Sequence, residues 1–234
     1  MALYSYVLRY DTGDAPNPYG GVCTLTVCKP AIRRTAEVGD WILGTGSKHS
    51  PIGNVAGYLV YAMRVSKKLT MAEYDRYCQK ELSIKIPGHH AHSRSLENLV
   101  GDSLYDFSKL TDGFPRHRGG IVHQDLGLQI RDWSGKYALL SDEFYYFGCE
   151  PRELPEPLLR IVKRNQGHYR RTDPSETVLF ESWIQQEGFE RNKVYAGPQD
   201  PLWNHVPTIV KLGFTTTNDP CSSIRKARSS ARCS

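Results

Sequence analysis

The stretch from residue 12 to residue 47 constrains the fold more than any other part of the chain. It opens on a loop, NPYGG at residues 17–21, in which proline fixes φ and glycine permits positive φ. A β-branched and apolar run at residues 22–28 then predicts a strand, and Pro30 stands at a plausible first position of a short helix. Gly39 and Asp40 predict a turn into another strand, which starts at Trp41. A loop, a strand, a helix and a strand are therefore expected in direct succession.

The rest of the chain adds strands and helices around this unit. Apolar or alternating patterns predict strands at residues 4–9, 55–65, 120–126 and 136–148. Helix-start signals predict helices at residues 71–82 after the capping box of Thr70 and Glu73, at residues 156–163, and from Pro174 to a stop at Gly188. Between residues 86 and 118 the pattern breaks down, which is typical of a functional or a disordered stretch. We expect one domain over residues 1–218 with a helical C-terminal elaboration, followed by a flexible basic tail at residues 219–234.

Composition excludes several classes of protein. The chain of 234 residues is long enough for a good core, and it has no apolar run of the ~18 residues that a membrane span needs. The start, MALYSYVLRYD, lacks the pattern of a secretory signal, so we expect a cytoplasmic protein with no membrane partner. Six cysteines are scattered without a C-x-x-C pair, which predicts neither a zinc ribbon nor a disulfide framework and favours buried or incidental thiols.

Basic residues gather in four clusters, although the net charge of +5 is mild. The clusters lie at residues 33–34, 116–118, 160–171 and 225–232. Each can be a solvated helix face or a loose tail, or else a surface that binds phosphates. Under the second interpretation the phosphate-binding residues are Arg33, Arg34, Arg116, Arg170 and Arg171.

Aromatic rings and two glycine-rich turns are candidates for a base-binding pocket. Flipped or unpaired bases are held by stacking on rings and by hydrogen bonds to base edges. The candidate residues are Asn17, Tyr19, Trp41, Thr45, Ser47 and Tyr58, with Trp41 as the preferred stacking ring. The alternative is that the rings lie in the core and that the turns are simple loops at a barrel rim. The spacing of the glycines matches neither a Walker loop nor a dinucleotide fingerprint, which argues against a nucleotide triphosphatase or a Rossmann enzyme.

His123 and Asp125 are the candidates for acid–base chemistry. A His-x-Asp spacing can place both side chains on one face of a strand, as a general base and an orienting acid. The alternative is an ordinary polar segment, because the chain has no H-E-x-x-H, no zinc-deaminase pattern and no G-x-S-x-G elbow. We predict no metal site, and the sequence shows no motif that binds a cofactor or a donor of alkyl, glycosyl or methyl groups.

Four segments of the chain resemble a known family. They are SYVLRYDTGDAPNPYGGVCTLTVCKPAIRRTAEVGDWILGTGS, LVYAMRVSKKLTMAEYDR, HQDLGLQI and YALLSDEFYYFG, between about Leu3 and Gly148. Together they resemble the second nucleotide-modification-associated domain family of bacteria and phages. The helix, the Gly-Asp-Trp strand and the VYAMRV strand are also similar to the PUA-like group of small β-barrels, which includes readers of modified bases. The resemblance implies a role around modified nucleobases, and it transfers no catalytic residue.

Two functions follow from these observations. The first is a PUA-like α+β domain, a mixed β-barrel with peripheral helices, that binds nucleic acid and accepts a modified or flipped base at the barrel mouth. The second is an enzyme of nucleobase modification or hypermodification that uses His123 and Asp125. The expected partners are nucleic acid, DNA rather than RNA, or a nucleotide, together with enzymes of a base-modification pathway. A third hypothesis is an interaction module within a modification complex.

Overall fold

The computed structural model describes residues 1–88, 96–120 and 122–201. The strands of its main sheet are β1 (Leu3–Leu8), β3 (Trp41–Gly46), β4 (Tyr58–Arg64), β9 (Glu143–Tyr146), β10 (Arg152–Glu153), β11 (His168–Arg171) and β12 (Lys193–Val194). Their order is β11-β1-β3-β4-β9-β12, with β10 paired to β4. β1 runs parallel to β3 and β12 parallel to β9, whereas the other pairs are antiparallel.

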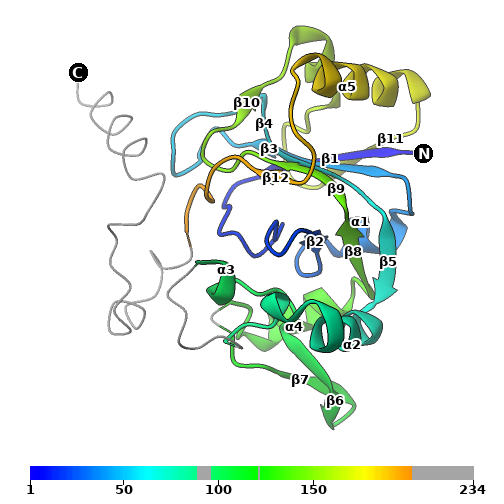
Figure 1. Cartoon of the computed structure of the whole chain (residues 1–234), viewed down its shortest axis with the longest axis vertical. Helices are drawn as coiled ribbons and strands as arrows, with labels where there is room; N and C mark the ends of the chain where they lie inside the picture. The colour runs from blue at the N-terminus through cyan, green and yellow to red at the C-terminus, as the bar shows by residue number, and fades with distance from the viewer. Residues whose placement is uncertain (89–95, 121, 202–234) are drawn as a thin grey trace, which may run out of the picture.

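The remaining strands form a small sheet and a hairpin. β2 (Cys23–Leu25), β8 (Tyr137–Ser141) and β5 (Lys67–Thr70) pair in the order β2-β8-β5, and β6 (Tyr105–Thr111) pairs with β7 (Phe114–His117). The helices are α1 (Pro30–Thr35), α2 (Met71–Glu81), α3 (Leu96–Leu99), α4 (Leu126–Trp133) and α5 (Pro174–Gln186), with 3-10 turns η1 (Ser83–Lys85) and η2 (Glu156–Ile161). α5 and the hairpin lie at opposite ends of the molecule (Figure 1).

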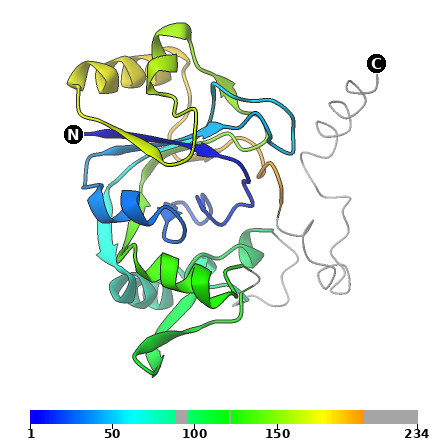
Figure 2. The same ribbon diagram turned by 180° about the vertical axis from the view of Figure 1, so that it is seen from behind.

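The main sheet has a core on each of its faces. On one face Tyr4 and Tyr6 of β1 pack in a buried cluster with Leu25 of β2 and Ile32 of α1. On the other face lies a second cluster, built from Leu3, Trp41, Leu43, Leu158, Ile161, Phe180 and Trp183, which joins the sheet to η2 and α5. This division follows from the alternation of side chains along a strand. The loop that precedes β2 lies inside the molecule (Figure 2). It lies between the main sheet and the end of the molecule that carries α2 and α4.

Several sequence predictions are confirmed. The short helix starts at Pro30 and the next strand at Trp41. α2 has its capping box, because Glu73 N donates to Thr70 Oγ1 and Thr70 N donates to Glu73 Oε2. Asp173 caps α5, as its N-cap position predicted.

Other predictions differ from the structure. The strands of the described residues form three sheets and no closed barrel, so the α+β class is confirmed whereas the PUA-like barrel is not. The stretch 86–118, expected to be irregular, contains the hairpin of β6 and β7. The described residues of the segment 120–126 form no strand, because Asp125 is the N-cap of α4, which starts at Leu126. Cys149 is disulfide-bonded, whereas no disulfide was expected. The predicted tail at residues 219–234 lies outside the described residues.

Candidate active site

A thiol lies in an unusual backbone position between β2 and α1. Cys28 has φ 55° and Lys29 has φ 38°, both in the left-handed region that residues other than glycine seldom adopt. The half-buried Cys28 Sγ lies 3.6 Å from Nε2 of His123, which itself has φ 56°. Strained conformations of this kind persist where the surrounding structure fixes them, and they gather at functional sites.

An aspartate completes the arrangement from the far side of the imidazole. His123 Nδ1 donates a hydrogen bond to Oδ2 of Asp132, which is fully buried on α4. The other carboxylate oxygen of Asp132 accepts from the backbone N–H of Cys28 at 2.7 Å. Tyr105 OH also donates to Oδ2, at 2.8 Å. The carboxylate therefore orients the imidazole and holds the backbone that carries the thiol.

A buried guanidinium supports this group from α1. Arg33 is 0% exposed and donates to the main-chain oxygens of Thr26 and Asp132. Gly135 leaves room for it, because a Cβ at that position would overlap the guanidinium. Burial lowers the pKa of Arg33 to about 10, with the negative charge of Asp132 acting in the opposite direction. Arg33 is thus part of the frame around the site.

The environment favours the protonated form of His123. Burial opposes that form, but the hydrogen bonds with Asp132 and Cys28 outweigh it and raise the pKa of His123 to about 10. A protonated histidine beside a thiol stabilises the thiolate, which is the nucleophilic form of cysteine. The order thiol, imidazole, carboxylate is that of a nucleophile, its acid–base partner and the group that orients the partner.

The acid paired with His123 differs from the one predicted. Asp125 does not orient the imidazole; its Oδ1 caps α4 by accepting from the N–H groups of Gly127 and Leu128. The prediction of His123 and Asp125 on one strand face differs from the structure because residue 125 caps a helix, and this helix brings Asp132 to the imidazole instead.

The polar residues predicted to contact a base edge lie inside the protein. Asn17 is 0% exposed, donates from its amide to Val100 O and accepts from Lys85 Nζ at 2.7 Å. Thr45 is equally buried and donates to Tyr6 O. These side chains are occupied by contacts within the fold. The other three candidates are Tyr19, which is 7% exposed, Ser47, which lines a separate cleft, and Tyr58, which is half-buried.

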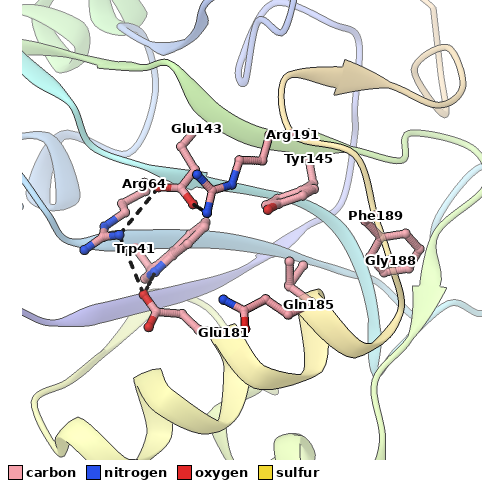
Figure 3. Close-up of a pocket in the computed structure, with 10 residues that line it drawn as sticks. Trp41, Arg64, Glu143, Tyr145, Glu181, Gln185, Gly188, Phe189 and Arg191 are labelled. Atoms are coloured by element: carbon pink, nitrogen blue, oxygen red, sulfur yellow. Dashed lines mark hydrogen bonds and ion pairs between the residues drawn. The ribbon is translucent and has the colours of Figure 1, made fainter.

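Trp41 borders a cavity but contributes little open surface to it. The cavity measures about 350 Å³ and is also lined by Arg64, Glu143, Tyr145, Glu181, Ile184, Gln185, Gly188, Phe189 and Arg191. Trp41 is 2% exposed, its ring stacks on Tyr145, and its Nε1 donates to Glu181 of α5 at 2.9 Å (Figure 3). The ring is therefore packed and hydrogen-bonded within the protein.

The predicted phosphate-binding arginines lie on three elements of the fold, α1, β7 and β11. Arg33 is buried, so its guanidinium is not presented to solvent. Arg34 on α1, Arg116 on β7 and Arg170 on β11 are exposed. Arg171 is half-buried and donates to the main-chain oxygen of residue 160. Arg170 donates to Tyr4 OH, which in turn donates to the main-chain oxygen of Thr35, next to Arg34.

A family model matches most of the chain. The family model described as nucleotide modification associated domain 2 matches residues 1–204. The chain belongs to this family. No curated protein and no solved structure matches the chain. Membership supports a role in a nucleotide-modification system. None of the helices in the described part of the chain has the length and apolar character needed to traverse a bilayer.

Two residues of the site in this nucleotide modification associated domain 2 protein are not predicted from the sequence. As one of six scattered cysteines, Cys28 is interpreted as an incidental thiol, and Asp132 belongs to no motif that points to chemistry. The available signal for Cys28 is its place between an apolar strand and a proline-started helix. The available signal for Asp132 is its position near the end of LGLQIRDW. This short segment follows the cap Asp125, and its apolar residues recur with a helical pattern.

Proposed function

We propose that this chain is a cysteine-dependent enzyme of a nucleotide-modification system. Cys28 is the nucleophile, His123 its general acid and base, and Asp132 the positioning residue. The observation that carries the proposal is the continuous chain from Cys28 Sγ to His123 Nε2, at 3.6 Å, and from His123 Nδ1 to the buried carboxylate of Asp132. In keeping with the family, the substrate is a nucleotide or nucleic acid, or a group attached to its base. We propose DNA rather than RNA as the nucleic acid.

The arrangement fits acyl transfer or hydrolysis. The sulfur of Cys28 attacks a carbonyl carbon, and its proton resides on His123 Nε2. When the tetrahedral intermediate collapses, the bond to the leaving group breaks and that group takes the proton from His123. The thioester is then attacked by water or by an amine, which transfers a proton to His123. The C–S bond breaks, the acid or amide leaves, and the sulfur of Cys28 takes the proton back from His123.

The alternative of a reader without chemistry receives less support from the geometry. A reader needs exposed rings and polar edges for the base, whereas Trp41 is 2% exposed and Asn17 and Thr45 are 0% exposed. The enzyme is therefore the conclusion that we favour over the reader.

The test is to trap an acyl-enzyme. The native protein is incubated with an activated aryl ester, quenched in acid, and digested so that mass spectrometry locates the acyl group. We expect it on Cys28, and we expect His123→Ala and Asp132→Asn to slow its formation, the former by about a hundredfold or more. Cys23 and Cys78 are internal controls, because burial raises the pKa of each thiol to about 12.

Nucleoside mass spectrometry then connects the chemistry to the family. Modified and plain DNA are incubated with the wild-type protein and with Cys28→Ala, and the nucleosides are compared. Acylation spread evenly over the cysteines, or unaffected by His123→Ala, would overturn the proposed nucleophile.

A further inference from the structure

A second cleft lies between the loop that follows β3 and the segment that follows η2. Its volume is about 430 Å³, within the range of sites for small molecules. One wall carries Ser47, Lys48 and His49, and the other carries Lys163 and Arg164. The two walls come from distant parts of the chain, so the cleft exists only in the folded protein.

The charge of the cleft has one sign. Lys48, His49, Lys163 and Arg164 line it, and in the part of the chain that the structure describes no acidic side chain does so. Nor does an ion pair within the described residues engage Lys48, Lys163 or Arg164. Lys163 donates to the amide oxygen of Asn165 at 3.3 Å, and its ammonium lies 4.5 Å from the ring centroid of Tyr169. None of these contacts neutralises the positive charge, which can therefore act on an anion.

The floor of the cleft is apolar and has a defined shape. Val7, Leu159 and Val162 contribute the apolar side chains, and Val162 is 9% exposed. Gly46 is required at its position, because a Cβ there would overlap the main-chain oxygen of Val55. Ser47 Oγ accepts from the N–H of His49 at 3.1 Å, which fixes the turn that presents the first wall. An apolar floor under a cationic rim suits a ligand with a flat apolar part and a phosphate.

The cleft is separate from the Cys28 site. Tyr6 of β1 belongs to the core cluster on one face of the main sheet, and the ammonium of Lys29, next to Cys28, lies 4.3 Å from its ring centroid. Val7, the next residue of β1, lines the cleft. Since successive side chains of a strand point to opposite faces, the cleft and the thiol lie on opposite faces of the sheet.

We propose that this cleft binds a phosphate of a nucleotide unit, with the sugar and base against the apolar floor. Lys and Arg are the side chains that neutralise phosphates, and here they approach from two walls. Arg164 and Leu159 also line an adjoining hollow together with Glu156 and Arg160, and Arg160 lies 3.6 Å from the carboxylate of Glu176. That hollow is therefore of mixed charge, and the cationic walls of the cleft suit a single phosphate, which a mononucleotide and an oligonucleotide both carry. The inference uses no residue of the proposed catalytic group and stands apart from it.

The experiment measures fluorescence anisotropy of a labelled single-stranded oligonucleotide with the full chain over a range of salt. Lys163→Glu/Arg164→Glu changes one wall and Lys48→Glu/His49→Glu the other. The matched control is Arg76→Glu/Lys80→Glu on exposed positions of α2, with the same change in charge as the first variant. A mononucleotide, tested by competition, separates a free nucleotide from a polynucleotide as the source of the phosphate.

We expect each wall variant to weaken oligonucleotide binding about tenfold or more. The slope of the logarithm of the binding constant against the logarithm of the salt concentration should become shallower by roughly 0.7 for each phosphate of the single strand that the variant no longer neutralises. The control should change neither quantity comparably. Binding of the mononucleotide alone, abolished in both wall variants, would also support the cleft and assign it to free nucleotides. Three outcomes would overturn the proposal. They are that neither probe binds, that the control variant weakens oligonucleotide binding as much as the wall variants do, or that only one of the two wall variants weakens it. Acylation of Cys28 is unaffected by these variants, so failure of one proposal is distinguishable from failure of the other.

Discussion

Replacement of Asp132 by asparagine tests the electrostatics of the candidate active site most directly. Asparagine has nearly the same shape, and its amide oxygen can still accept from the N–H of Cys28, as Oδ1 of Asp132 does at 2.7 Å. What disappears is the negative charge that holds the proton on His123 Nδ1. Because burial alone disfavours imidazolium, we expect the pKa of His123 in Asp132→Asn to fall to its ordinary value or below.

The expected magnitude follows from the pKa of His123. The change from 6.5 to about 10 corresponds to at most about 5 kcal/mol of preferential stabilisation of the protonated form, at 1.36 kcal/mol for each pKa unit. Because the folded-state pKa is the higher one, this stabilisation is fully present below pH 6.5. It is lost progressively as the pH rises to about 10. The difference in unfolding free energy between wild type and Asp132→Asn should therefore be large at pH 6 and should shrink towards pH 10.

Two measurements check this expectation. Urea denaturation at several pH values gives the difference in stability, and ¹⁵N NMR of the histidine rings gives the protonation state of His123. The matched control is Asp125→Asn, which removes the same charge from the start of the same helix and leaves a good capping residue. The reasoning is refuted if His123 of the wild type loses its proton near pH 6.5, or if Asp125→Asn reproduces the pH dependence of Asp132→Asn.

Substitutions at three further positions test whether buried residues stabilise the fold rather than bind a ligand. Trp41→Ala should cost about 3 to 5 kcal/mol of stability in urea denaturation and leave oligonucleotide affinity per folded molecule unchanged, whereas Trp41→Phe should keep most of the stability. Arg33→Met should destabilise by several kcal/mol, about 3 to 5, because buried acceptors and the charge of Asp132 lose their partner, and the salt slope of oligonucleotide binding should not change. Lys85→Met should lower the melting temperature, because Lys85 is 0% exposed and donates to Asn17 O, Asn17 Oδ1 and Val22 O.

Local signals in the sequence predict a good part of the fold. The proline at position 30, the capping box at Thr70 and the cap at Asp173 act over one turn of helix, so a single sequence reveals them. The pairing of β1 with β3, and of β9 with β12, depends on contacts between distant segments. No local pattern encodes those pairings, so the sequence does not reveal that the strands of the described residues form three sheets rather than a closed barrel.

The candidate site shows the same division between local and distant information. His123 can be singled out by residue type, but the sequence pattern places its partner two residues away on an assumed strand. A helix that starts after Asp125 places residue 132 two turns further on, and the carboxylate of Asp132 reaches back to the imidazole. Cys28 joins them from a distant upstream segment. Sequence spacing cannot predict that meeting, because it depends on how α1 and α4 pack.

Arg33 links the stability of the fold to the geometry of the site. Its guanidinium donates to Thr26 O, two residues before Cys28, and to Asp132 O on α4, so one side chain ties together the two segments that carry the thiol and the carboxylate. A cation without this environment would be costly to bury, and the acceptors around it are main-chain oxygens that also need donors. The two neighbouring arginines therefore differ in role. Arg34 is exposed to solvent, whereas Arg33 is buried and helps to hold Asp132 in the site. A change in the packing of α1 should accordingly shift the position of the Cys28 thiol, because Arg33 and the carboxylate of Asp132 connect the two. This holds even though α1 itself contributes no side chain to the group of Cys28, His123 and Asp132.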